Sequence, residues 1–359
     1  MNFTTKSMVN NDDIISEAFV SIIIVNYNGG KDIIDCIESI NKTVNNRFEI
    51  ILIDNNSTDN SQKICKQKFP SILLIQNERN LGLSARNIGL KKAKGNFIVF
   101  LDSDTMVKDN WLSTLIDCYR KNGNGLYQPK LLEKDRPEII DNCGNMINIF
   151  GLAYSRGKGE KDIGRYEKFQ TISYTAGSCS FFSTQTMKKI GMIDEVFFAY
   201  HDDVDYGWRA KLIGIPSYYE PKAIVYHKGS KTLKWSKKKF FLLERNRIIC
   251  VFTLYSISTL LRIFPLLILV DIGIFIFFLK KGMGYTKLKA NLSILKLIPK
   301  ITERRKKILH GRTSSDKEVI KKFVDDFHLP DVLADKESAA KYNSLIFKLS
   351  KFSRKLINI

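Results

Sequence analysis

Four short apolar runs recur through the first third of the chain, at residues 19–25, 48–53, 72–75 and 97–101. The segments between them carry apolar residues at helical spacing, for example Ile33, Ile37 and Ile40. Strands that alternate with helices in this way predict a parallel sheet with right-handed crossovers. Because the runs are apolar without interruption, we expect both faces of the sheet to be covered. The pattern therefore predicts an α/β fold with a mainly parallel sheet flanked by helices.

The same pattern divides the chain into four regions. Residues 1–18 are polar and contain Asp12, Asp13 and Glu17, so we expect a flexible tail without a secretory signal. Residues 19–245 are predicted to form one large domain, because the shorter apolar runs of its second half continue the domain as an α+β elaboration. An apolar helical segment at 246–281 and a basic, helical region that ends in a polar tail at 282–359 complete the chain.

The stretch from 248 to 279 is almost wholly apolar and is broken by Arg262, Pro265 and Asp271. Its two halves are short for a full membrane crossing. Basic residues flank both ends, which places both ends in the cytoplasm by the positive-inside rule. We therefore predict a re-entrant or tightly bent helical hairpin, with its bend at Arg262 and Pro265, on the cytoplasmic face of the cell membrane. A hairpin buried in the protein core is the alternative.

The formal net charge of +20 is unevenly placed, with strongly basic stretches at 228–239 and 280–307. By charge alone such stretches suit an anionic lipid surface or nucleic acid. They lie beside the apolar segment and are not interleaved with a platform of aromatic residues, which favours a membrane surface and argues against a nucleic-acid partner. The six cysteines form no Cys-x-x-Cys and no zinc spacing, as is typical of reduced thiols in a cytosolic protein. The oligomeric state stays open.

Two carboxylates, Asp102 and Asp104, follow directly after the apolar run 97–101. Open α/β sheets bind ligands at the carboxyl ends of their strands. Two acids so close repel each other unless a cation or hydrogen bonds compensate, and Mg²⁺ prefers one or two carboxylates together with substrate phosphates. The pair therefore predicts a divalent metal site that holds a phosphorylated ligand. A helix N-cap beside a solvated acid is the alternative.

Three further polar clusters follow predicted strands at the same edge of the sheet. They are Asn26, Tyr27 and Asn28 after the first strand, Asp54 and Asn56 after the second, and Asn80, Gly82 and Arg86 after the third. Each cluster alone is compatible with a tight turn or a helix cap. Together they place an aromatic ring, a carboxylate and several amides on one rim, where they could bind a nucleobase and its ribose, while Arg86 meets phosphate.

The stretch 197–209 combines an aromatic run with three carboxylates, Asp202, Asp203 and Asp205. A carboxylate beside aromatic residues tends to have a raised pKa, which suits a general base. A helix N-terminal cap is the alternative. His227 follows a later strand-like run, and it is either structural or a metal or diphosphate ligand that complements the acids of the first site.

Taken in order, these motifs resemble the family 2 glycosyltransferases of the GT-A fold, over roughly residues 19–245. The resemblance rests on the strand end Asn26-Tyr27-Asn28, on Asp54, on the segment from Asn80 to Asn87, on Asp102-Ser103-Asp104 and on Asp202-Asp203. The stretch 175–182 resembles the acceptor-side segment of the branch that includes rhamnosyl- and galactofuranosyltransferases. The ordered series is much more specific than any one of its motifs.

The resemblance implies a role for each motif. Asp54 would contact the nucleotide base and Arg86 would lie near the diphosphate. The nucleotide-sugar side would also include Asn26, Tyr27, Asn28, Asn56, Asn80, Gly82, Asp102 and Ser103. Asp104 would be the principal ligand of a Mg²⁺ or Mn²⁺ ion, with Asp102 and His227 beside it. Asp203 would be the catalytic base, and the acceptor side would include Gly177, Ser178, Asp202 and Trp208.

The implied activity is inverting transfer of a sugar from a nucleotide-diphosphate donor to a hydroxyl of a glycan, in particular a lipid-linked one. Such a reaction belongs to the synthesis of cell-surface polysaccharides or glycoprotein glycans. The Gln-x-x-Arg-Trp motif of processive synthases is absent, and the sequence from Glu244 to Arg247 stands nearby instead, which argues against processive synthesis. The alternative is a catalytically inactive nucleotide-binding or scaffolding subunit of a membrane glycan-assembly complex.

Overall fold

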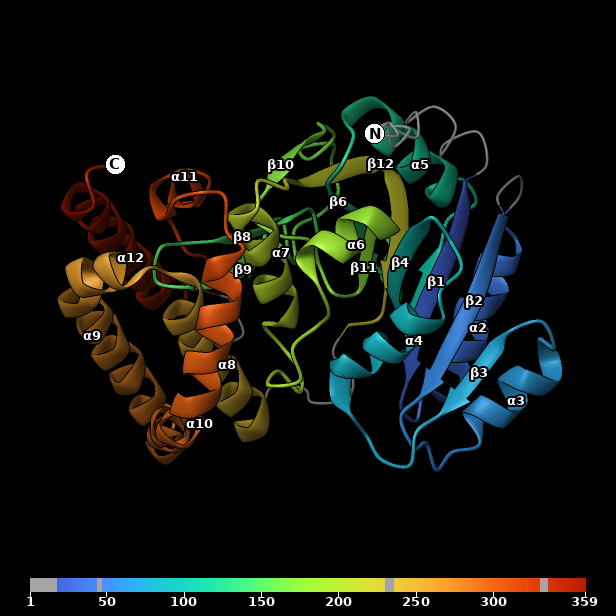
Figure 1. Ribbon diagram of the computed structural model, residues 1–359, viewed down its shortest axis with the longest axis horizontal. Coiled ribbons are helices and arrows are strands. Elements are labelled where there is room, and N and C mark those ends of the chain that lie inside the picture. The colour runs from blue at the N-terminus through green and yellow to red at the C-terminus, as the bar shows by residue number, and fades with distance from the viewer. Residues whose placement is uncertain (1–17, 44–46, 230–235, 330–334) are drawn as a thin grey trace, which may run out of the picture.

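The computed structural model describes residues 18–43, 47–229, 236–329 and 335–359, so the predicted tail lies, apart from residue 18, outside the described residues. The four strands predicted in the first third are present (Figure 1). They are β1 (Phe19–Asn26), β2 (Arg47–Asp54), β3 (Leu73–Gln76) and β4 (Phe97–Asp102). They pair in the order β3-β2-β1-β4 and all run parallel, which confirms the predicted arrangement for this part of the sheet.

Helices connect these strands and cover both faces of the sheet. They are α2 (Gly30–Asn41), α3 (Ser61–Lys68) and the short helix η1 (Gly82–Ala85), which leads into α4 (Arg86–Lys92). In β1, Ile22 packs in one buried cluster with Ile33 of α2, whereas Ile23 packs in another with Leu90 of α4. Because alternate strand residues point to opposite faces, burial on both sides requires the uninterrupted apolar run that the sequence contains.

Beyond β4 the sheet is mixed. It continues with β5 (Thr105–Val107), β6 (Leu126–Glu133), β7 (Ile140–Asn142), β10 (Gln170–Ile172), β11 (Cys179–Ser183) and β12 (Ser217–His227). β11 lies antiparallel between β4 and β6, and β12 runs parallel to β6. The same region contains α5 (Trp111–Asn122), α6 (Thr184–Ile190), α7 (Asp202–Leu212) and a hairpin of β8 (Asn145–Ile147) and β9 (Ala153–Ser155). The α/β class is confirmed, and the parallel arrangement holds for its first half.

Among the described residues after β12, five helices lie together on the left in Figure 1, away from β1 to β3. They are α8 (Lys237–Leu254), α9 (Ile257–Lys280), α10 (Gly284–His310), α11 (Asp316–Ile320) and α12 (Lys336–Leu356). Their buried faces share one apolar cluster with α7 and the loops beside it, for example through Ile249, Phe197 and Trp208. The C-terminal helices therefore pack directly on the sheet domain.

Three details of the C-terminal prediction are wrong. The break in the apolar segment lies at Tyr255 and Ser256, because the Ser256 side chain accepts a hydrogen bond from the Thr259 N–H and caps α9. Pro265, where the bend was predicted, lies inside α9 on its exposed side. The predicted boundary at 245/246 falls within α8, and the predicted polar tail contains the helix α12.

Candidate active site

A large cavity of about 1770 Å³ opens at the carboxyl ends of β1 and β4. Loops after the parallel strands form one wall, and residues of α7, α8 and α9 contribute to another. Ligand sites are expected at this edge of an open α/β sheet. The predicted site residues that line the cavity are Tyr27, Asn28, Asn80, Gly82, Arg86, Asp102, Ser103, Asp104, Gly177, Ser178, Asp202, Asp203 and His227.

The predicted metal ligands come together at this edge. Asp102 and Asp104 lie at and after the end of β4, and antiparallel pairing of β12 with β5 places His227 opposite Thr105. One ligand atom from each of the three side chains lies within 4.8 Å of the others. The Nε2 atom of His227 is 3.4 Å from the Oδ1 atom of Asp104. Two carboxylates and an imidazole suit a divalent ion such as Mn²⁺ or Mg²⁺, so this donor set fits the predicted metal.

Asp141 is a participant that the sequence did not reveal. Its carboxylate lies 2.9 Å from Nδ1 of His227 and also pairs with Lys158. Burial opposes ionisation of Asp141, but the hydrogen bond to His227 and the charge of Lys158 outweigh it and hold the pKa of this carboxyl below its usual range. A carboxylate on the second ring nitrogen fixes the orientation of a ligating histidine. Asp141 thereby orients His227 toward Asp104.

Arg86 connects the two groups of acids. Its side chain is only 2% exposed, and Nη2 donates hydrogen bonds to Oδ1 of Asp102 and to the Gly177 carbonyl, both at 2.7 Å. Nη1 lies 3.6 Å from the carboxylate of Asp202. The guanidinium was predicted to lie near the diphosphate of the donor. The structure places it on the cavity wall, between the metal-side acid Asp102 and the acid pair of α7.

Asp202 and Asp203 form the first turn of α7, and both line the cavity. Asp203 accepts hydrogen bonds from the main-chain N–H groups of Val204 at 2.8 Å and Gly177 at 3.3 Å. Burial raises the pKa of Asp203. Burial, together with the charge of Asp203, raises the pKa of Asp202 to about 7, although Arg86 opposes this. Asp203 is the more accessible of the two and Asp202 is paired with Arg86.

The turn before this acid pair has an uncommon backbone. Tyr200 and His201 both adopt positive φ, at 65° and 61°. Such a conformation costs free energy for residues other than glycine unless the surroundings hold it. Here Asn246 of α8 donates from its amide nitrogen to the carbonyls of Ala199 and Tyr200. A helix from the C-terminal region therefore supports the loop that presents Asp202 and Asp203.

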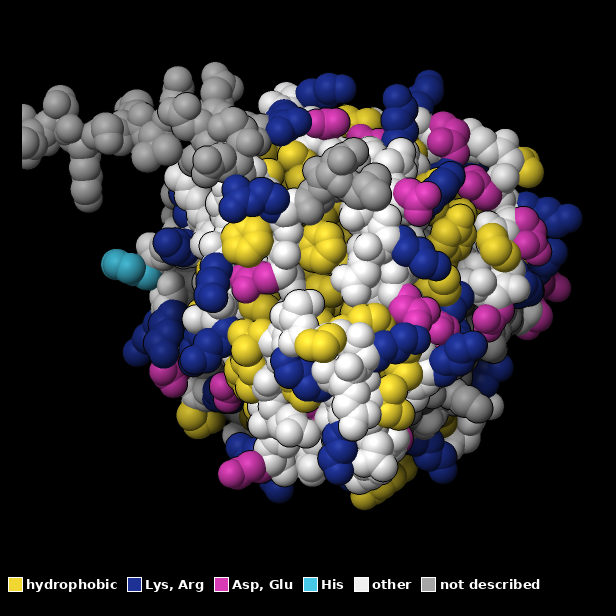
Figure 2. Space-filling view, turned by 90° about the vertical axis from the view of Figure 1, so that its right-hand side faces the viewer, with side chains coloured by type: hydrophobic (Ala, Val, Ile, Leu, Met, Phe, Trp, Pro, Cys, Tyr) yellow, Lys and Arg dark blue, Asp and Glu magenta, His cyan; other side chains and the backbone are white. Residues whose placement is uncertain are grey.

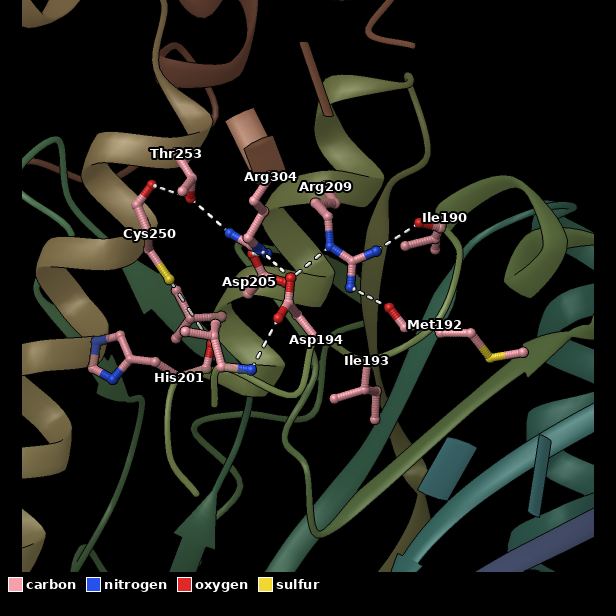
Figure 3. Close-up of polar contacts among 12 residues, drawn as sticks. Ile190, Met192, Ile193, Asp194, His201, Asp205, Arg209, Cys250, Thr253 and Arg304 are labelled. Atoms are coloured by element: carbon pink, nitrogen blue, oxygen red, sulfur yellow. Dashed lines mark hydrogen bonds and ion pairs between the residues drawn. The ribbon is translucent and has the colours of Figure 1, made fainter. Parts of the chain in front are cut away.

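The third acid of the motif, Asp205, is part of a buried network (Figure 3). Its carboxylate accepts a hydrogen bond from Nε of Arg209 at 2.8 Å and pairs with Arg304 of α10. Arg304 also pairs with Asp194 and donates to the Thr253 hydroxyl at 2.7 Å. Burial opposes ionisation of Asp205, but the charges of Arg304 and Arg209 lower its pKa. Asp205 is a structural acid.

On the nucleotide side, three predicted residues lie away from the cavity wall. Asn26 and Asp54 are cross-strand partners, and the Asn26 amide donates to the Asp54 carboxylate at 2.9 Å, so both side chains are buried. Asn56 is exposed and is not part of the lining. Asn55 lies on the wall instead, with its amide bonded to the Gly82 carbonyl at 2.9 Å. Tyr27 presents a 42% exposed ring there.

Trp208, predicted on the acceptor side, is not part of the site. Its ring is 1% exposed and packs edge-on against Tyr255 and Phe323. Trp208 lies more than one turn along α7 from Asp203, on the face that meets the C-terminal helices. Gly177 and Ser178, from the same prediction, do line the cavity.

Comparison with known proteins assigns this geometry to a family. The family description Glycosyl transferase family 2 matches residues 21–191, from β1 through α6. Residues 21–191 are therefore a domain of this family. The chain is 36% identical to "Glycosyltransferase GlyG" of Streptococcus pneumoniae serotype 4 over 139 residues. These residues are 38% of this chain and 42% of that relative. The chain thus matches less than half the length of this family 2 relative.

Two further proteins are more distant. "Low-salt glycan biosynthesis hexosyltransferase Agl10" of Haloferax volcanii is 22% identical over 249 residues, which cover 67% of this chain and 77% of the relative. The solved structure of GalNAc-T7 with UDP, GalNAc and Mn²⁺ superposes with a TM-score of 0.52 at 19% identity, over 66% of this chain and 48% of that one. The likeness supports the GT-A fold of this chain.

Proposed function

We propose that this chain is an inverting glycosyltransferase that moves a sugar from a nucleotide-diphosphate donor to a hydroxyl of a glycan. One observation carries the proposal: the triad Asp102, Asp104 and His227 and the acid pair Asp202 and Asp203 line the same cavity. Displacement of a nucleoside diphosphate requires charge neutralisation at the phosphates and a base at the attacking hydroxyl. The cavity contains residues suited to both tasks.

The metal-side residues have one role in this proposal. Asp104, Asp102 and His227 would hold a divalent ion, which supplies Lewis-acid neutralisation of the departing diphosphate. Asp141 and Arg86 hold these ligands, through His227 and Asp102 respectively. Tyr27 offers an exposed aromatic ring on which a nucleobase can stack.

The base-side residues carry the proton transfer. Asp203 accepts the proton of the acceptor hydroxyl as its oxygen attacks the anomeric carbon and the bond to the diphosphate breaks. Two main-chain N–H groups orient Asp203, and burial raises its pKa toward the range in which a base is effective. One base without an enzyme nucleophile implies a single displacement, and hence inversion.

The lining of the cavity supports a lipid-linked acceptor. On the side of α9 the wall is apolar and includes Ile274, Phe277 and Phe278, and Lys238 and Lys239 at the start of α8 also line the cavity. An apolar wall beside basic side chains suits an amphiphile that carries a phosphate. We place the reaction at the cytoplasmic face of the cell membrane, where such acceptors would be presented.

The test is acceptor-dependent release of nucleoside diphosphate. The full chain is incubated with a panel of nucleotide sugars, Mn²⁺ and extracted lipid-linked glycans, beside Asp203→Asn and the matched surface variant Asp117→Asn. Release by the wild type and by Asp117→Asn, but not by Asp203→Asn, is the expected result. Nucleotide binding without turnover across the whole panel would contradict the proposal and favour a non-catalytic subunit.

A further inference from the structure

We propose that α9 and α10 form a docking surface for an anionic lipid bilayer, with both helices lying along the membrane plane. Such docking would bring the enzyme to a lipid-linked acceptor in the bilayer, and only this consequence rests on the proposed function. The docking surface consists of the outward-facing side chains of α9 and α10. The exposed side chains, the internal ion pairs and the charge of these two helices support membrane docking.

The outer face of α9 is a continuous apolar stripe. Exposed members that recur at three- and four-residue spacing are Ile257, Leu261, Phe264, Ile268, Ile272, Phe275 and Leu279, and Leu269 and Ile276 are exposed beside them. Such spacing places them on one side of the helix. Among the described helices, α9 is the one that is long and apolar enough to cross a membrane by length and composition. Length alone does not distinguish a crossing helix from one that lies on the surface.

The inner face of α9 distinguishes a helix that lies on the membrane surface from one that crosses the membrane. Ile263, Val270 and Phe278 are buried against the other C-terminal helices. Asp271, at the middle of α9, pairs with Arg247 of α8 at 3.0 Å and with Lys287 of α10. A helix that crossed the bilayer surrounded by lipid would leave these partners and expose an acid to hydrocarbon, which is costly. α9 can meet lipid while it keeps its partners only if it lies along the surface.

α10 carries a second exposed apolar stripe. A short turn after Lys280 joins the two helices, and Figure 1 shows that they meet at one end and then diverge. The exposed apolar residues of α10 again follow helical spacing and are Tyr285, Leu288, Leu292, Leu295 and Ile298. Its opposite face is buried, through Ala290 and Arg304 for example. Each helix therefore has one packed side and one apolar side that faces outward.

The positive charge of this surface favours an anionic lipid bilayer over a second copy of the chain. Between residues 257 and 302 the sequence has a single acid, the paired Asp271. Six exposed basic residues border the apolar stripes, namely Arg262, Lys280, Lys281, Lys289, Lys296 and Lys300. On the face shown in Figure 2, by contrast, basic and acidic side chains are intermixed. A second copy of this chain would bring like charges to such a surface, whereas anionic headgroups complement it.

The docking surface lies beside the cavity, because one of its helices also lines that cavity. Phe277 and Phe278 of α9 line the same cavity as Asp203. α9 thus contributes both to the proposed lipid surface and to the wall of the cavity that contains the candidate base. An acceptor with its lipid in the bilayer would reach Asp203 past this helix.

Vesicle sedimentation of the full chain, without donor or acceptor, tests binding. The wild type should bind phosphatidylglycerol vesicles, and binding to phosphatidylcholine vesicles should be weaker. The apolar variant combines Leu261→Gln, Ile272→Gln and Leu295→Gln, and its matched control combines Ile64→Gln, Ile163→Gln and Met192→Gln, all exposed residues elsewhere. We expect at least a ~10-fold loss of binding in the apolar variant and little change in the control. Equal binding by the two variants would overturn the inference.

Charge and self-association are tested in the same assay. Lys280→Gln, Lys281→Gln and Lys296→Gln together should weaken binding to anionic vesicles, whereas the equally charged change at Lys91, Lys92 and Lys94 should not. Dimerisation of the wild type that the apolar variant abolishes, without any vesicle binding, would assign the surface to a second copy and overturn the inference.

Cysteine labelling in sealed membrane vesicles distinguishes a helix along the plane from a spanning one. The six native cysteines are all buried, so the single changes Ser258→Cys and Lys281→Cys place a reactive thiol near either end of α9. With the cytoplasmic side outward, an impermeant maleimide should label both variants. Labelling of one end only after permeabilisation would show that α9 spans and would overturn the inference. Because neither assay needs glycosyl transfer, failure here and failure of the proposed function are separate outcomes.

Discussion

Arg304 of α10 and Asp205 of α7 form an ion pair that is buried from solvent, with side chains 6% and 1% exposed. Asp205 lies two residues beyond Asp203, in the same turn of α7. The pair therefore ties the helix that carries the candidate base to a helix of the proposed membrane surface. Figure 3 shows Arg304 reaching into this network opposite Arg209. The position of the candidate base thus depends on the C-terminal helices.

Replacing Arg304 with methionine should destabilise the protein strongly. The change keeps much of the apolar stem but leaves part of the Asp205 charge uncompensated in the interior, which costs about 3 kcal/mol when one partner of a buried pair is lost. Urea unfolding followed by circular dichroism measures the effect. Lys307→Met is the control, since its pairing with Glu303 is exposed and such pairs contribute little. A loss below about 1 kcal/mol would show that Arg209 alone neutralises Asp205.

The sheet could be predicted from the sequence because burial on both faces leaves a local mark. Runs such as 97–101 are apolar without interruption, and Figure 1 shows β4, β1 and β2 as neighbouring strands, with β3 at the edge of the sheet. The break before α9 was missed although Ser256 and Thr259 carry a helix-cap signal, because the interruption at Arg262 and Pro265 was the more conspicuous one. α12 was missed although Asp335 caps it and its apolar residues recur at helical spacing, because the polar residues of the segment were interpreted as a tail.

The candidate site was predictable where its residues follow strand ends. Asp102 and Asp104 were placed at the edge of the sheet on that basis, and His227, predicted after a later strand-like run, lies beside them because β12 pairs with β5. Asp203 follows an aromatic run at the start of α7, and its role was predicted from the family resemblance. Asp141 could not be found, because its contact with His227 spans 86 positions and depends on β7. Asn26 and Asp54 were predicted on the cavity side, but they are buried and hydrogen-bonded to each other across neighbouring strands.

Asp104→Ala should abolish metal-dependent binding of nucleoside diphosphate while the fold is retained. Asp104 is partly exposed at the cavity, and loss of its carboxylate removes one of two acidic donors from the triad. Thermal shift with UDP or GDP, with and without Mn²⁺, measures the effect, since ligands of the folded state raise its stability. Asp109→Ala, at an exposed position nearby, should behave as the wild type. An undiminished Mn²⁺-dependent shift in Asp104→Ala would remove Asp104 from the metal site.

His201 should make stability fall in mildly acidic solution. Burial lowers its pKa to about 4, so the folded chain binds this proton more weakly than the unfolded chain does. The neutral ring therefore stabilises the protein fully above about pH 6.5, and the stabilisation is lost as the pH falls toward 4, by roughly 3 kcal/mol in all. His201→Asn suits the positive φ and cannot titrate. Its unfolding free energy should fall less between pH 7.5 and 4.5 than that of the wild type or of the exposed control His310→Asn; equal falls would contradict the burial argument.

Asp203→Asn should retain donor binding and lose transfer. The amide keeps the size of the side chain, and its single oxygen can still accept the N–H of Val204, although the Gly177 N–H at 3.3 Å loses its acceptor oxygen. The amide cannot take a proton. Loss of a general base lowers the rate by roughly 10²–10⁴-fold. Single-turnover transfer at saturating donor compares it with Asp202→Asn and Asp205→Asn. Because Asp202 is paired with Arg86 and Asp205 with Arg209 and Arg304, we expect the former to alter positioning and the latter mainly stability. If Asp203→Asn transfers sugar at nearly the wild-type rate while Asp202→Asn is inactive, Asp202 is the base, and its pKa of about 7 would then be the one that sets the pH profile.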